Sequence, residues 1–192
     1  MTSISNTDWA RNMAAFRITK YDPALRTESG AYPFDDWTTV RDVGQIRRGK
    51  RVTIQDYLLA EDRYLRAVRS LMVAADVERL RLSLIDPGPE PLFGVPEALV
   101  ESTSDDFALI GRKRLLKGPL VDAAIRLGLR TGSIGELCGP NGFYLQISDD
   151  MYVYCGFYYT FTRAPSGQPV LPMAPEGLFF EEFPSPFFYE MP

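Results

Sequence analysis

Apolar residues return every three or four positions from Ile54 to Met72, which is the spacing of one face of an α-helix. Thr53 stands just before this stripe, where its hydroxyl can accept a hydrogen bond from the amide of Asp56 and mark the first turn. One position breaks the stripe, because Glu61 falls in the middle of the apolar face, within about 20° of Ile54. The pattern therefore predicts a long helix, ending near residue 75, that turns one carboxylate toward the core.

Alternating apolar and polar positions predict short strands on both sides of this helix. A second, shorter helix is predicted from Pro119 to about Leu127, with Gly128 at its end, and the glycines from 132 to 142 are expected to mark turns. The predicted strands span residues 15–21, 79–85, 143–148, 151–159 and 178–183, of which the third and fourth form a β-hairpin.

These elements predict an α+β fold, with a mostly antiparallel sheet packed against one long helix and a C-terminal aromatic β-hairpin layer. A chain of 192 residues is long enough for one core, so we expect a single domain over 1–192, with residues 1–12 poorly ordered. Residues 1–12 lack a signal pattern, and no run approaches 18 apolar residues, which favours a soluble cytoplasmic protein with no membrane contact.

Composition changes this picture most through histidine, which the chain lacks entirely. Histidine is the usual general base near neutral pH and the commonest metal ligand, and no serine-nucleophile motif is present either. We therefore expect a protein that is not an enzyme, with no catalytic residue, no cofactor and no metal. Cys138 and Cys155 lack metal-site spacing and are read as free core thiols, with a disulfide between adjacent strands as the alternative.

Charge separates the two ends of the chain. The net charge is −4 and the pI is near 5.0, which disfavours binding to nucleic acid. Beyond Thr131 there are seven acidic residues and one basic residue, Arg163, while 14 of the 24 aromatic residues fall between Phe143 and Tyr189. An acidic, aromatic C-terminal part suits a basic protein partner.

The candidate partner-binding residues follow from the predicted hairpin. Tyr152 and Tyr154 should share its outer face, because Val153 and Cys155 are better core fillers. The acidic candidates lie at the hairpin tip and on a strand expected to be its neighbour, and they are Asp149, Asp150, Glu181 and Glu182. The alternative is that these aromatic side chains simply pack in the core.

Two further charged features have structural explanations. Glu61 is predicted to be a buried acid paired with a base of the N-terminal segment, namely Arg17, Lys20 or Arg41, and the alternative is a tuned acid in a cleft. The basic segment from Arg112 to Lys117 has no interleaved aromatic residues, so a solvated face is favoured over a phosphate grip.

The segment 16–44, followed by VTIQDYLLAEDRYLRAV, resembles a family of small bacterial proteins that look like immunity factors of polymorphic toxin systems. The resemblance covers about 70 residues, and the C-terminal part from Tyr152 to Tyr154 and from Phe180 to Pro186 matches more loosely. The proline-rich stretch at 87–96 departs from the pattern. The residues that carry the resemblance are Arg17, Ile18, Thr19, Lys20, Tyr21, Asp22, Pro23, Arg26, Gly30, Trp37, Asp42, Gly44, Tyr57, Glu61, Asp62 and Tyr64.

The resemblance implies a cytosolic inhibitor that binds and neutralises a toxin domain. Together with the charge pattern it predicts an immunity-type inhibitor of a basic toxin, for example a nuclease, bound through the acidic, aromatic surface. Two alternatives stay open: a carboxylate- and metal-dependent enzyme, and an adaptor or assembly subunit that forms homo-oligomers.

Overall fold

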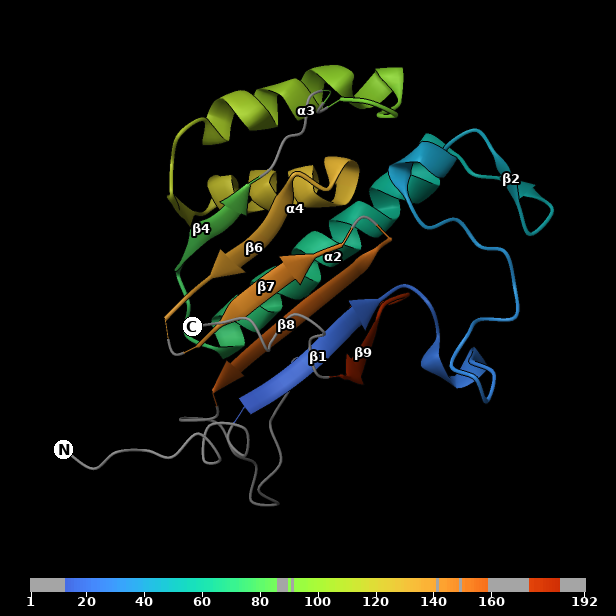
Figure 1. Cartoon of the computed structure of the whole chain (residues 1–192), viewed down its shortest axis with the longest axis horizontal. Helices are drawn as coiled ribbons and strands as arrows, with labels where there is room; N and C mark the ends of the chain where they lie inside the picture. The colour runs from blue at the N-terminus through green and yellow to red at the C-terminus, as the bar shows by residue number, and fades with distance from the viewer. Residues whose placement is uncertain are drawn as a thin grey trace.

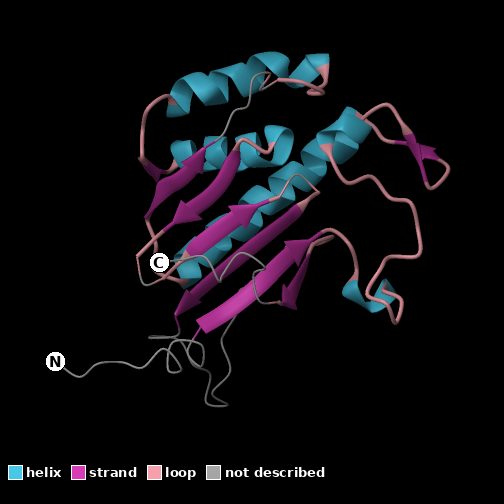
Figure 2. Cartoon of the chain, in the orientation of Figure 1, coloured by secondary structure: helices cyan, strands magenta, loops and turns pink. Residues whose placement is uncertain are grey.

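The computed structural model describes residues 13–85, 90, 92–140, 142–148, 150–158 and 173–183. It confirms the α+β class: a seven-stranded antiparallel sheet lies against α-helices (Figures 1 and 2). The strand order is β5-β4-β6-β7-β8-β1-β9. The strands are β1 (Met13–Thr19), β4 (Arg79–Ile85), β5 (Leu115–Lys117), β6 (Ile134–Cys138), β7 (Tyr144–Ile147), β8 (Tyr152–Tyr158) and β9 (Phe179–Glu182), and the α-helices are α2 (Ile54–Ala74), α3 (Glu97–Ile110) and α4 (Pro119–Thr131).

Helices α2 and α4 lie against one face of the sheet, and α3 packs on α4 (Figure 1). The core between these layers takes apolar residues from every helix and from most strands. A small separate hairpin, β2 (Ile46–Arg47) and β3 (Lys50–Arg51), stands beside the start of α2, after two short 3-10 turns at Pro23–Leu25 and Val40–Asp42 (Figure 1). No α-helix in the described part of the chain is long and apolar enough to cross a membrane.

Helix α2 begins where the sequence predicted. The Thr53 hydroxyl accepts the amide of Asp56 at 3.1 Å, and the Asp56 carboxylate accepts the amide of Thr53 at 2.9 Å. This capping box satisfies two backbone donors that a helix start would otherwise leave without partners. The apolar stripe then packs on the sheet, with Tyr57 and Tyr64 fully buried.

The predicted hairpin forms the middle of the sheet as β7 and β8, and the N-terminal strand β1 lies between β8 and β9. The sequence analysis missed α3, β5 and β6. The structure places β6 among glycines that were expected only to mark turns. Helix α3 starts at Pro96 without a side-chain cap, so the usual sign of a helix start is absent.

Helix α4 is longer than predicted, because Gly128 does not end it. The helix continues to Thr131 and stops at Gly132, whose φ of 69° is left-handed. Gly128 is needed instead for close packing, since a Cβ there would lie 2.7 Å from Cγ2 of Ile147. The glycine therefore lets α4 approach β7.

Glu61 is buried and paired, as predicted, with 4% of its surface exposed. The predicted partners were wrong. Arg130 of α4 holds the carboxylate with two hydrogen bonds of 2.6 Å and also donates to Ser102 and Thr103 of α3. A planar guanidinium is suited to such a fork, and this one ties α2, α3 and α4 together.

Two more arginine–carboxylate pairs join the same helices. Arg126 of α4 pairs with the buried Asp106 of α3, and Arg69 of α2 pairs with the buried Asp122 of α4. Arg126 and Arg130 therefore join helices within the fold. The segment from Arg112 to Lys117 itself is exposed except for Leu116, as expected for a solvated face.

Both cysteines are free, as predicted. Cys155 lies in the core, and burial raises the pKa of its thiol to about 12. Such a thiol stays protonated at neutral pH and fills space as a small apolar group.

Candidate functional site

The first candidate region is the face of the sheet opposite the helices, where β8, β1 and β9 lie side by side. Register places Arg17 of β1 between Tyr154 of β8 and Glu181 of β9. Because alternate residues of a strand point to opposite faces, these three side chains form one row, and Tyr152 lies beside it. We call Arg17, Tyr152, Tyr154, Glu181 and Phe183 the Arg17 face.

Arg17 organises this face although only 7% of its surface is exposed. Its guanidinium binds Glu181 at 2.6 Å and lies over the rings of Tyr152 and Phe183, 4.7 Å and 4.2 Å from their centroids. Arg26 binds the same Glu181 oxygen at 3.0 Å. Two cations therefore bind one carboxylate, so Glu181 contributes no excess negative charge to the surface.

The predicted partner-binding residues are only partly brought together. Tyr152 and Tyr154 share a face, with Val153 and Cys155 turned into the core, as predicted. Tyr154 is buried, with 9% of its surface exposed, and Tyr152 is half-buried. Asp149 lies outside the described residues.

The two glutamates of β9 point in opposite directions. Glu181 belongs to the Arg17 face, while the register of Glu182 opposite Phe16 places it on the other side of the sheet. Strand β9 pairs with β1, so it is not the neighbour of β8 that the sequence analysis expected. The four acidic candidates therefore do not form one patch.

Asp150 is the acidic candidate that keeps an unused acceptor. Its Oδ1 is shielded from solvent and has no hydrogen-bond partner among the described residues. Burial raises the pKa of the nearby Tyr152 to about 12, and the negative charge of Asp150 adds to this effect. The pKa values of Tyr21 and Tyr154 are also raised, first by burial and then in part by Asp150. Asp150 thus lies near a group of tyrosines and makes no ion pair within the part of the chain that the structure describes.

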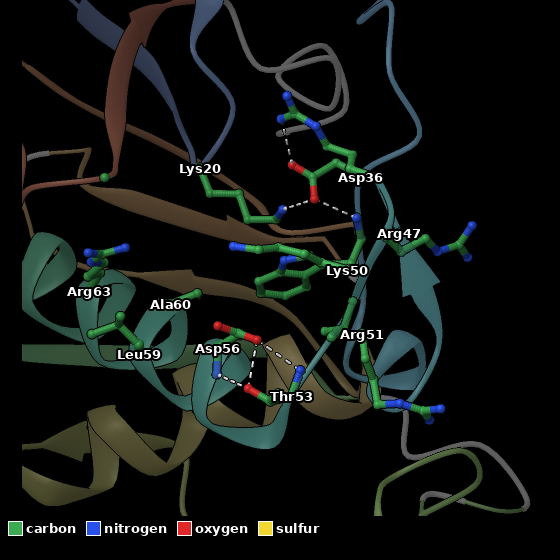
Figure 3. Close-up of a pocket in the computed structure, with 14 residues that line it drawn as sticks. Lys20, Asp36, Arg47, Lys50, Arg51, Thr53, Asp56, Leu59, Ala60 and Arg63 are labelled. Atoms are coloured by element: carbon green, nitrogen blue, oxygen red, sulfur yellow. Dashed lines mark hydrogen bonds and ion pairs between the residues drawn. The ribbon is translucent and has the colours of Figure 1, made fainter.

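The second candidate region is a cavity of about 800 Å³ that the sequence analysis did not predict (Figure 3). It lies between the end of β1, the loop before β2, the β2–β3 hairpin and the first half of α2. Two carboxylates, Asp36 and Asp56, line it, and Trp37 and Leu59 supply apolar wall. The basic residues that line it are Lys20, Arg47, Arg48, Lys50, Arg51 and Arg63, so we call it the basic cavity.

Lys20 is the most shielded cation of the basic cavity, with 9% of its side chain exposed. Its Nζ lies 4.0 Å from the centroid of the Trp37 ring and 3.5 Å from Oδ1 of Asp36. Burial lowers the pKa of Lys20 to about 8, and the attraction of Asp36 only partly offsets this. A proton on Lys20 is therefore held less tightly than on a lysine in water.

Charge compensation is uneven around the basic cavity. Arg47 is fully occupied, because Asp42 binds it at 2.6 Å and Asp35 at 2.9 Å. Lys50 and Arg63 make no ion pair with any carboxylate in the described part of the chain.

The two carboxylates that line the basic cavity do not neutralise its remaining cations. Asp36 is shared by Lys20 and by Arg48, whose Nη1 is 4.0 Å from Oδ2 of Asp36. Asp56 is held by Thr53 in the capping box of α2. The basic cavity therefore keeps an excess of positive charge on a chain whose net charge is −4.

A sequence signal for the basic cavity does exist. Residues 47–51 place four basic side chains within five positions, and Trp37 lies ten residues before them. What the sequence could not show is that Lys20 and Arg63 would join this run, because Lys20 follows β1 and Arg63 lies on α2. Trp37 and Lys20 also belong to the segment that resembles immunity proteins.

Comparisons of the chain with protein-family models, with curated proteins and with solved structures find no match. The resemblance to immunity proteins therefore stays a prediction. In the described part of the chain, no group of three or more His, Cys, Asp or Glu side chains is placed to hold a metal ion.

Proposed function

We propose that this chain is an immunity-type inhibitor that binds a basic toxin domain through the Arg17 face and the adjoining Asp150. The resemblance over about 70 residues supplies the class of protein. The observation that carries the proposal is Asp150, whose shielded Oδ1 receives no hydrogen bond from the described residues. A buried acceptor without a partner costs about 1–3 kcal/mol, so a donor from a bound partner would gain stability there.

The Arg17 face supports this role by its rigidity. Arg17 is fixed by Glu181 and by two aromatic rings, and Tyr152 and Tyr154 lie 6.3 Å apart between centroids. Ordered aromatic side chains lose little further entropy on binding, which makes them effective contact residues. Tyr152 is the half-buried member and would supply the contact, while the buried Tyr154 would hold it in place.

Four buried carboxylates of the described chain have arginine partners within the fold. Glu61, Asp106 and Asp122 are each gripped by an arginine, and Asp42 by Arg47. Structural pairing of these acids favours binding over the carboxylate-dependent enzyme alternative. Chelation that abolished a measured activity would favour the enzyme instead, and a size measurement of the purified chain would detect the oligomer.

The test has two steps. The partner is first identified by co-purification from the native host and mass spectrometry, and its association with the chain is then measured at several salt concentrations. We expect Asp150→Lys to slow association at least tenfold and to weaken its salt dependence.

The matched control is Asp62→Lys, because Asp62 is an exposed acid on α2, away from the Arg17 face. It makes the same change of net charge and should leave the association rate within about twofold of wild type. Equal rates for Asp150→Lys and wild type would contradict the proposal.

A further inference from the structure

The proposed inhibitor role does not use the basic cavity. The cavity lies just beyond the C-terminal end of β1, shares no residue with the Arg17 face, and is built from several separate segments of the chain. A volume of about 800 Å³ is within the range of about 300–1,000 Å³ that is typical of sites for small organic ligands. The cavity is thus large enough for a ligand of nucleotide size.

The charges of the cavity select the sign of such a ligand. Lys20, Lys50 and Arg63 approach the same space from the residue after β1, the β2–β3 hairpin and α2 (Figure 3). Like charges around one cavity repel each other, and the described carboxylates do not form ion pairs with all of these cations. An anion bound among them would remove this repulsion.

The number of cations favours a ligand with more than one negative charge. One cation is enough to neutralise a single carboxylate, whereas phosphate groups carry several acceptor oxygens and up to two charges each. Arg48 and Arg51 stand on the same hairpin as Lys50, so a chain of two phosphates could contact several donors at once.

The cavity also has apolar lining, beside its cations and the carboxylates Asp36 and Asp56. This lining includes the Trp37 ring, Val52, Leu59 and Ala60, and Leu59 is 49% exposed although it is a large aliphatic side chain. A site that combines cations with apolar groups suits a ligand that has an organic body as well as phosphates.

We propose that the basic cavity is a binding site for a phosphorylated small molecule with an apolar or aromatic part, of the class of a nucleoside diphosphate. Lys20, Lys50 and Arg63 hold the phosphates, and Trp37 and Leu59 contact the organic part. This site shares no residue with the Arg17 face, so it can be tested separately from the proposed inhibitor role.

Trp37 provides a direct probe of the site. The chain has two tryptophans, and Trp9→Phe leaves Trp37 as the only one. In full-length Trp9→Phe protein, titration with ADP at constant ionic strength should change the Trp37 fluorescence in a saturable manner. Inorganic pyrophosphate should bind more weakly, because it lacks the organic part, and adenosine should not bind because it lacks the phosphates.

Variants that replace a cation by a neutral side chain test whether these residues bind the phosphates. Lys50→Gln combined with Arg63→Gln should weaken ADP binding at least tenfold, since each lost charge-assisted contact is expected to matter. The control combines Arg66→Gln with Lys113→Gln, which removes the same charge from α2 and from an exposed position after α3, both outside the cavity. Calorimetry measures the same binding without relying on fluorescence.

Two results would overturn the inference. One is the absence of saturable ADP binding to a protein whose circular dichroism shows it to be folded. The other is equal weakening by the cavity variant and by the control variant, which would show that only net charge matters. Neither result bears on association through Asp150, which is measured with the protein partner.

Discussion

Arg17 in strand β1 and Lys20 just after the strand are three positions apart and lie in very different surroundings. Arg17 binds a carboxylate at 2.6 Å and contacts two aromatic rings, so its charge is neutralised within the fold. Lys20 has to share Asp36 with Arg48 and lies among further cations. Ion-paired side chains such as Arg17 hold secondary-structure elements together, whereas cations without ion pairs around a cavity indicate a ligand site.

The same contrast separates the helix layer from the basic cavity. Arg130, Arg126 and Arg69 each grip a buried acid of another helix. Lys50 and Arg63 have no such partner in the described chain. Substitutions should therefore cost folding stability in the first group and ligand affinity in the second.

The largest effect is expected at Glu61. Glu61→Ala leaves the buried Arg130 without its carboxylate and should lower the free energy of unfolding by about 3–5 kcal/mol, measured by urea denaturation. The neighbouring Asp62→Ala is the control, because the Asp62–Arg66 pair is exposed, and it should cost less than about 0.5 kcal/mol. A loss below about 1 kcal/mol for Glu61→Ala would show that Arg130 finds other partners.

Lys20 should give the next largest effect, through pH. Its pKa is lowered to about 8 in the folded chain, from 10.5, so the unfolded chain binds more protons between these two values. Stability from this group therefore rises as pH increases from about 8 to about 10.5, by up to about 3 kcal/mol.

Lys20→Met removes this contribution. The difference in unfolding free energy between variant and wild type should favour the variant near pH 7 and shrink as pH rises toward 10. A difference that stays constant from pH 7 to pH 10 would contradict the lowered pKa.

A smaller loss is expected at Arg17. Arg17→Leu keeps much of the buried volume but removes the pair with Glu181 and the contacts with Tyr152 and Phe183. Arg26 still binds Glu181, so the cost should be about 2 kcal/mol. Arg17→Lys should recover part of this loss, and thermal denaturation of the two variants would show whether it does.

The smallest stability effects are expected at Lys50 and Arg63, two exposed or half-buried cations of the basic cavity. Lys50→Gln and Arg63→Gln should each change the unfolding free energy by less than about 0.5 kcal/mol, because neither removes an ion pair of the described chain. A loss above about 1 kcal/mol for either would mean that the side chain supports the fold, and the contrast between the two regions would then fail.

The sequence predicted the elements whose patterns are local. The stripe and cap of α2, the alternation of β4 and the hairpin of β7 and β8 all depend on neighbouring residues, and they are where they were expected. Helix α3 has no side-chain cap, so the same reasoning had little to detect.

Features that depend on distant segments could be predicted only in part. The position of Glu61 on an apolar face predicted burial and pairing, but Arg130 lies 69 positions away and reaches it only when α4 packs on α2. For the same reason the sequence named one acid, Glu181, that Arg17 and Arg26 already bind, and it missed a cavity whose cations come from separate segments.

The most direct test of the contrast is the titration of the Lys20 amine by NMR in chain labelled at lysine side chains, assigned with Lys20→Arg. We expect the amine to titrate near pH 8 in the free chain, because burial and neighbouring cations disfavour its proton. Saturating ADP should raise this pKa by at least one unit, since a bound phosphate stabilises the protonated amine. A Lys20 amine that titrates near 10.5 with and without ADP would contradict the account.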